Sequence, residues 1–208
     1  MNNRAKWNVN ENFDTPGKVF VGCLARLAAF QAHTAELIAS LENAIGPIDD
    51  IWQPEVGWIA PNSYAIEMGE SLTTIILVFD GFRQQDSLAW IKQRTLEIED
   101  SYTPCRSRTF NLNPGIVDQV SMRLASHKWS PRRRQIDEGI WVEDQMYWIR
   151  NRLMPLSYTF QEYVMGTRLK RLRRLAGRIY SPVEYMKKKR VTKWETGRHQ
   201  PAKILRAK

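Results

Sequence analysis

The sequence has little of what marks the specialised classes of protein. Only two of its 208 residues are cysteine, Cys23 and Cys105, which is too few for a disulfide framework or a thiolate metal site. No apolar run reaches the ~18 residues of a membrane-spanning helix. The polar, Asn-rich start over residues 1–14 lacks the apolar stretch of a secretory signal. These absences favour a cytoplasmic protein with reduced thiols and no membrane span.

Sequence motifs that indicate a catalytic activity are also missing. The sequence contains neither the phosphate-binding pattern G-x-x-x-x-G-K-[ST] nor the dinucleotide pattern G-x-G-x-x-G. Its three histidines, His33, His127 and His199, form no pair with metal-ligand spacing. No nucleophile-elbow pattern is present either. We therefore expect no cofactor and no metal, and the sequence favours a non-catalytic protein.

The distribution of charge is the most informative feature that is present. Residues 1–165 hold 16 Lys/Arg and 20 Asp/Glu, a net charge of −4, whereas residues 166–208 hold 15 and 2, a net charge of +13. The whole basic excess of the chain, +9, therefore comes from its last segment. Such asymmetry indicates a polyanionic partner and says nothing about the fold.

Hydrophobic patterning predicts an α/β fold with a mixed, α+β-like sheet in the order βα-βα-βα-ββ, followed by a basic helical tail. Gly46-Pro47 ends the first helix, Thr34 and Asp86 precede the first two helices as caps, and residues 48–70 are expected to form a loop. The expected strands are 18–24, 72–80, 108–112, 134–136 and 140–149, and the expected helices are 34–45, 87–100 and 113–124. The predicted domains are a disordered leader at 1–16, an α/β domain at 17–163 and a basic extension at 164–208.

The start of the third helix is a candidate site for a small anion. Asn113-Pro114-Gly115 follows a predicted strand, and free N–H groups at a helix N-terminus attract anions. Lys128 and the nearby arginines would supply positive charge. The simpler alternative is an ordinary asparagine cap before a proline at the first helical position. The candidate anion-binding residues are Asn111, Asn113, Gly115, Arg132 and Arg133.

The tail is a candidate nucleic-acid interface. Leu169, Leu172 and Leu175 recur at helical spacing with cations between them, which is typical of a basic amphipathic helix. We expect this arm to bind RNA or the ribosome. An anionic membrane surface and a merely solvated run of charge are the alternatives. The candidate contact residues are Arg168, Lys170, Arg171, Arg173, Arg174, Arg178, Lys187, Lys188, Lys189 and Arg190.

Short motifs in a common order give the chain a family resemblance. They are Lys18–Gly22 (KVFVG), Gly46–Ile48 (GPI), Glu67–Gly69 (EMG), Asn111–Gly115 (NLNPG) and Leu156–Tyr163 (LSYTFQEY). Through these motifs, residues 18–163 resemble the bacterial domain-of-unknown-function family 4416. The resemblance implies no established activity. Where the family has Asp, Asp and His, this chain has Asn113, Trp129 and Arg132, so any family chemistry that needs those groups would be lost here.

Two functions therefore remain open from the sequence, beside a third and weaker option, a structural subunit of an assembly. The first is a non-catalytic protein that binds RNA or the ribosome through its basic C-terminal arm. The second is a protein or enzyme that binds a small anion or a nucleotide at Asn111–Gly115.

Overall fold

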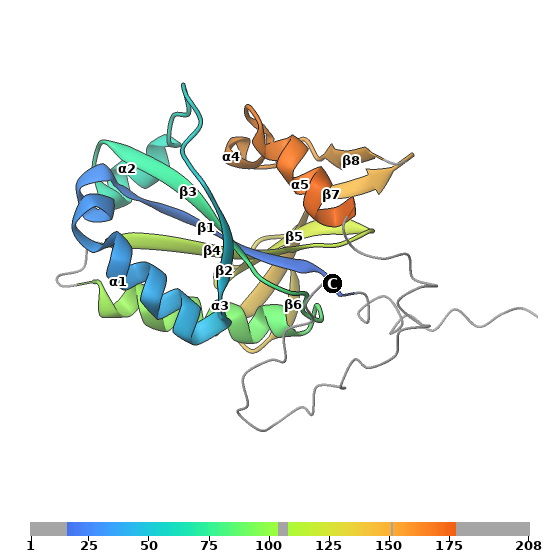
Figure 1. Cartoon of the computed structure of the whole chain (residues 1–208), viewed down its shortest axis with the longest axis horizontal. Coiled ribbons are helices and arrows are strands. Elements are labelled where there is room, and N and C mark those ends of the chain that lie inside the picture. Colours follow the sequence, from blue (N-terminus) through green and yellow to red (C-terminus); the bar gives the residue numbers. More distant parts are fainter. Residues whose placement is uncertain (1–15, 104–107, 151, 178–208) are drawn as a thin grey trace, which may run out of the picture.

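The computed structural model describes residues 16–103, 108–150 and 152–177, which form one antiparallel sheet covered by helices on both faces (Figure 1). The sheet order is β2-β3-β1-β4-β5-β7-β6, and β8 also pairs with β7. The strands are β1 (Lys18–Arg26), β2 (Ile48–Trp52), β3 (Leu72–Phe79), β4 (Phe110–Val117), β5 (Ser121–Ser126), β6 (Arg134–Asp137), β7 (Ile140–Ile149) and β8 (Arg152–Pro155). The helices are α1 (Leu27–Ile45), α2 (Asn62–Met68), α3 (Ser87–Ser101), α4 (Gln161–Val164) and α5 (Arg168–Gly177). The predicted combination of α and β structure is confirmed.

Strand β1 lies at the centre of the sheet, between β3 and β4. Val19, Val21 and Cys23 face the side that α1 and α3 cover, and Phe20 faces the side that α4 and α5 cover. This double burial explains why both β1 and β3 read as continuous apolar runs and not as alternating ones. Both strands were predicted, and both are confirmed.

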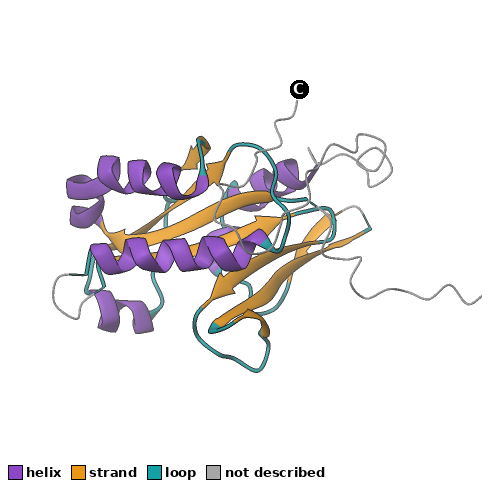
Figure 2. Ribbon diagram, turned by 90° about the horizontal axis from the view of Figure 1, so that it is seen from below, coloured by secondary structure: helices purple, strands orange, loops and turns teal. Residues whose placement is uncertain are grey.

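The two long helices lie side by side across one face of the sheet (Figure 2). Helix α1 buries Leu37, Leu41 and Ile45, the stripe that the sequence predicts. The helix begins already at Leu27, however, so Thr34 is no cap, and its hydroxyl donates to the Phe30 carbonyl one turn earlier. The expected loop at 48–70 is also wrong in part, because it contains β2 and α2.

The third predicted helix does not exist, because residues 110–126 form the antiparallel strands β4 and β5. The side chain of Asp118 accepts hydrogen bonds from the backbone of Val120 and Ser121 and so closes the turn between them. Pro114 lies just outside the β4–β5 pairing, which begins at Gly115, so its missing N–H leaves no gap in that ladder. The helix N-terminus on which the predicted anion site rests is therefore absent.

The C-terminal part of the described chain adds the hairpin β6–β7, which was predicted, and then β8, α4 and α5. Leu172, Leu175 and Ala176 of α5 are buried against the second face of the sheet, together with Tyr163 of α4. Helix α5 was predicted as the start of a basic extension, and the structure packs it into the core. Among the described residues, no helix has the length and apolar character needed to cross a membrane.

Candidate functional site

A polar pocket opens where β4 and β5 meet α2, α3 and the loop after β5. The space between its lining residues is about 510 Å³, and this figure includes the open mouth of the pocket. Four cationic side chains reach it from three different parts of the chain: Lys92, Arg108, Lys128 and Arg133. Asn111 and Asn113, two residues apart on one side of β4, line it as well.

The inner wall of the pocket is a buried network around Glu99. Lys92 and Glu99 lie two helical turns apart on α3, and both are almost fully buried. The Lys92 Nζ donates to the Leu112 carbonyl at 2.8 Å and lies 3.4 Å from Glu99 Oε1, which also accepts from the Leu112 N–H at 2.8 Å. Burial lowers the pKa of Lys92, and the carboxylate of Glu99 opposes that shift.

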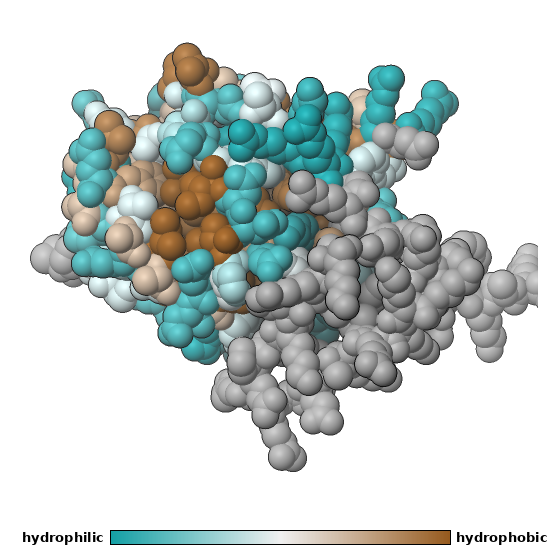
Figure 3. Space-filling model, in the orientation of Figure 1, coloured by the Kyte–Doolittle hydropathy of each residue, from teal (hydrophilic) through white to brown (hydrophobic). Residues whose placement is uncertain are grey.

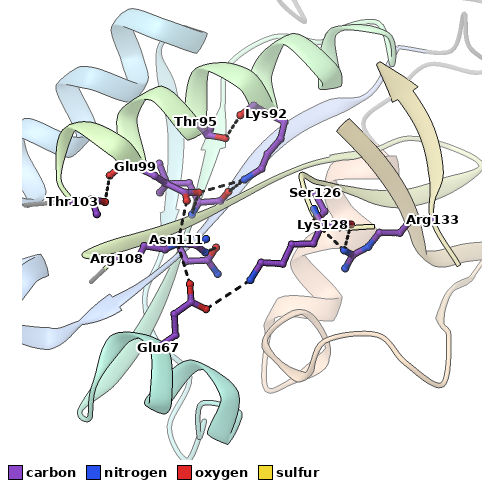
Figure 4. Close-up of polar contacts among 11 residues, drawn as sticks. Glu67, Lys92, Thr95, Glu99, Thr103, Arg108, Asn111, Ser126, Lys128 and Arg133 are labelled. Atoms are coloured by element: carbon purple, nitrogen blue, oxygen red, sulfur yellow. Dashed lines mark hydrogen bonds and ion pairs between the residues drawn. The ribbon is translucent and has the colours of Figure 1, made fainter. Parts of the chain in front are cut away.

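Arg108 and Lys128 converge on Glu67 of α2 at a second wall (Figure 4). The Arg108 Nε lies 3.4 Å from Glu67 Oε1 and 3.5 Å from Glu99 Oε2, so this guanidinium joins the two carboxylates. Its NH1 donates to Asn111 Oδ1 at 2.9 Å. The Nδ2 of Asn111 is buried and makes no hydrogen bond of normal geometry among the described residues, although its contact with the Tyr64 hydroxyl opposes the rise that burial causes in the pKa of that phenol.

Glu143 of β7 organises the remaining wall. Its two oxygens lie 2.9 Å from Arg132 Nε and 3.4 Å from Arg133 Nε. The NH1 of Arg133 donates to Ser126 Oγ at 2.9 Å and to the Lys128 carbonyl at 2.6 Å, which fixes the guanidinium at the pocket. The Arg132 guanidinium instead stacks 4.6 Å above the ring of Tyr158.

The charges around the pocket do not cancel. Among the described residues, the ion pairs that border the pocket join five cations (Lys92, Arg108, Lys128, Arg132 and Arg133) to three carboxylates (Glu67, Glu99 and Glu143), an excess of two positive charges. His127, which also lines the pocket, responds to this excess. Burial is the largest cause that lowers its pKa to about 4, and repulsion by Lys92, Arg108 and Lys128 adds to the effect. The imidazole is therefore neutral at pH 7.

The structure brings most of the predicted anion-binding residues together. They meet at the strands β4 and β5 and the loop after them, and not at the N-terminus of a helix as predicted. Asn111, Asn113 and Arg133 line the pocket, and Arg132 supports it through Glu143. Gly115 belongs elsewhere, because an added Cβ there would overlap with the ring of Phe20 on the adjacent strand β1. Tyr64, Lys92, Arg108 and Glu143 were not among the predicted site residues, and no anion-binding motif marks them. His127 was predicted only as an isolated histidine.

The predicted nucleic-acid residues of α5 do not form one exposed face. Arg168 is fully buried, and its guanidinium donates to the carbonyls of Glu162, Thr74 and Gln53 at 2.9, 2.8 and 3.1 Å. The prediction that Arg168 contacts nucleic acid is therefore wrong.

The other cations of α5 are at least partly accessible. Lys170 and Arg174 are exposed, whereas Arg171 and Arg173 are half-buried, and the latter donates to the Leu153 carbonyl at 3.2 Å. Arg178 and Lys187–Arg190 lie outside the described residues.

Comparison with known proteins adds one finding. No curated protein and no solved structure matches the chain. Residues 15–180 match a family described as Domain of unknown function (DUF4416). The match extends past the predicted boundary at 163 and includes α4 and α5, in keeping with their burial on the sheet. The chain belongs to this family of domains of unknown function.

Proposed function

We propose that the chain binds a small dianion of the phosphate type in the pocket between β4, β5, α2 and α3. The observation that carries the proposal is the uncompensated charge of five cations around three carboxylates. An anion of charge −2 would compensate this excess, and the cations that lie away from water, Lys92 and Arg108, would gain most from it.

The polar groups near the mouth of the pocket would contact the anion in different ways. Lys128 has a side chain that is 58% exposed and lies 3.8 Å from Glu67, so this weak pair can open and the ammonium can turn to a ligand. Arg133 is already held in place by Ser126 and offers a fixed guanidinium edge. Asn111 offers its buried Nδ2 donor, which would exchange its contact with Tyr64 for the anion. Lys92 lies deeper and contributes its charge.

Calorimetric titration of the full chain with inorganic phosphate at low salt tests the proposal. Lys128→Ala should weaken phosphate binding about tenfold, since it removes one hydrogen bond between charged groups. The matched control is Lys170→Ala, an exposed lysine of α5, which should bind as the wild type does. Absence of phosphate binding, or equal affinities for the wild type and Lys128→Ala, would refute the proposal.

A second candidate function rests on the charge of the tail. We propose that the basic segment 166–208, with its net charge of +13, binds RNA or the ribosome. Lys170 and Arg174 are exposed on α5 at the base of this segment, and Arg168 takes no part. For about 6–10 phosphate contacts, the affinity for a generic RNA should fall by roughly 10³–10⁵ between 50 and 200 mM salt.

Replacement of Lys187, Lys188, Lys189 and Arg190 by alanine provides the test of this second function. The variant should bind RNA more weakly and show a shallower dependence on salt. An unchanged salt dependence would contradict a role for the tail.

A further inference from the structure

The segment between β2 and α2 projects from the domain with an apolar tip. Its residues Val56 and Ile59 are 100% and 80% exposed, and Ile66 on the adjoining helix α2 is 88% exposed. These are the three most exposed large apolar side chains among the described residues. Figure 1 shows the segment standing out beside α2, and Figure 3 shows hydrophobic surface at its tip. Val56 and Ile59, three residues apart at the tip, form a small apolar protrusion that indicates a binding surface.

The projecting segment is held in a defined shape. Pro54 and Pro61 stand near its two ends, and Gly57, with φ of 80°, forms the turn at the tip. The N–H of Trp58 donates to the Glu55 carbonyl at 3.2 Å and closes that turn. The turn therefore has a defined conformation, and it holds the apolar side chains of the tip away from the core.

Contacts with the start of α5 tie this segment to the basic helix. Glu55 Oε1 accepts hydrogen bonds from the N–H and the hydroxyl of Thr167, at 3.0 and 2.9 Å. The buried guanidinium of Arg168 donates to the Gln53 carbonyl at 3.1 Å. Figure 1 shows the segment and α5 on the same side of the sheet. The base of the apolar tip is therefore hydrogen-bonded to the start of α5.

The exposed surface of α5 supplies cations beside the tip. The helix contains five basic residues and no acidic residue. Of these, Lys170 and Arg174 are exposed, and the side chain of Arg171 is 41% exposed. An apolar protrusion next to a cationic helix is the combination that suits an anionic lipid surface. Aliphatic and indole side chains enter the headgroup region, and basic side chains meet the acidic headgroups.

We propose that residues 54–61, together with Ile66 and the exposed cations of α5, dock the protein on the surface of an anionic membrane. Val56 and Ile59 enter the boundary between headgroups and acyl chains, and Lys170 and Arg174 lie over the acidic headgroups. RNA would bind the same cations, but it has no apolar interior that the aliphatic side chains of the tip can enter.

Co-sedimentation of the full chain with lipid vesicles tests this proposal. One set of vesicles contains only phosphatidylcholine, and the other contains equal parts of phosphatidylcholine and phosphatidylglycerol. The wild type should bind the second set. The double variant Val56→Asp/Ile59→Asp should lose at least about tenfold in partitioning, because two aliphatic side chains no longer leave water. Both positions are exposed, so the fold should persist, and a thermal melt checks this.

The matched control is Ile149→Asp, which changes an exposed isoleucine at the end of β7 in the same way. This variant should bind the anionic vesicles as the wild type does. Equal binding by the wild type and the double variant would overturn the proposal, because basic residues alone would then account for adsorption. Failure of the wild type to bind anionic vesicles while it binds RNA would overturn it as well.

Discussion

An anion that enters the pocket should raise the pKa of His127. In the free protein this pKa is about 4, against an ordinary value of 6.5, because the imidazole is partly buried and because Lys92, Arg108 and Lys128 repel its proton. A bound anion leaves the burial in place and offsets the repulsion. One unit charge at about 6 Å in an effective dielectric of about 40 contributes about 1.4 kcal/mol, or about one pKa unit. A dianion should therefore bring the pKa of His127 to about 5–6.

Proton NMR of the imidazole, followed against pH with and without sulfate, measures this shift. Sulfate is the probe because its charge stays constant over the range of the titration. His33, whose side chain is partly exposed on α1, does not line the pocket and serves as the internal control. The linkage has a defined sign: sulfate affinity should rise as the pH falls through the pKa of His127 in the complex. An unchanged His127 pKa, or a value near 6.5 in the free protein, would refute the electrostatic reasoning.

Three further predictions concern stability. Gly115→Ala should lower the free energy of unfolding by about 1–3 kcal/mol, because the added Cβ overlaps with the Phe20 ring and lies 2.7 Å from the Arg123 carbonyl oxygen. Denaturant melts should show this loss of stability, whereas a glycine in a helix would tolerate the change to alanine. Arg168→Met should cost about 3–5 kcal/mol in the same assay, since it deprives three backbone carbonyls of their donor, while exposed Lys170→Met should change little. Burial raises the pKa of Glu162 to about 7, so this carboxyl group keeps its proton in the folded state at a pH where it is ionised in the unfolded chain. The folded state should therefore lose stability as the pH rises from 4.5 through 7. Glu162→Gln should remove this dependence, and equal pH profiles of the two proteins in thermal melts would contradict it.

The parts of the fold that were predictable are those in which local pattern and burial agree. The continuous apolar runs of β1 and β3 follow directly from burial on both faces, and the stripe of α1 from burial on one. The segment 113–124 misled the analysis because Ile116, Val117 and Val120 recur at helical spacing. In the structure this spacing bridges two strands and the turn that Asp118 closes.

Only some residues of the candidate site could be predicted from the sequence, for a similar reason. Asn111 and Arg133 were found through a local motif and a run of arginines. Lys92 looks like an ordinary surface residue of an amphipathic helix, and Glu67 lies in a segment that was predicted as a loop. Only the packing of α2 and α3 around β4 brings them to the pocket. Arg168 shows the converse error, because its setting in a basic run hides its burial among three backbone carbonyls.

A crystal structure of the full chain grown with tungstate, a heavy dianion of the phosphate type, tests the central claim most directly. The account predicts an anomalous peak inside the pocket, within hydrogen-bonding distance of Lys128 Nζ, the Arg133 guanidinium and Asn111 Nδ2. It also predicts that Lys128 leaves Glu67 to meet the ion. Tungstate bound only at exposed cations such as Lys170 and Arg174, with water in the pocket, would contradict the account.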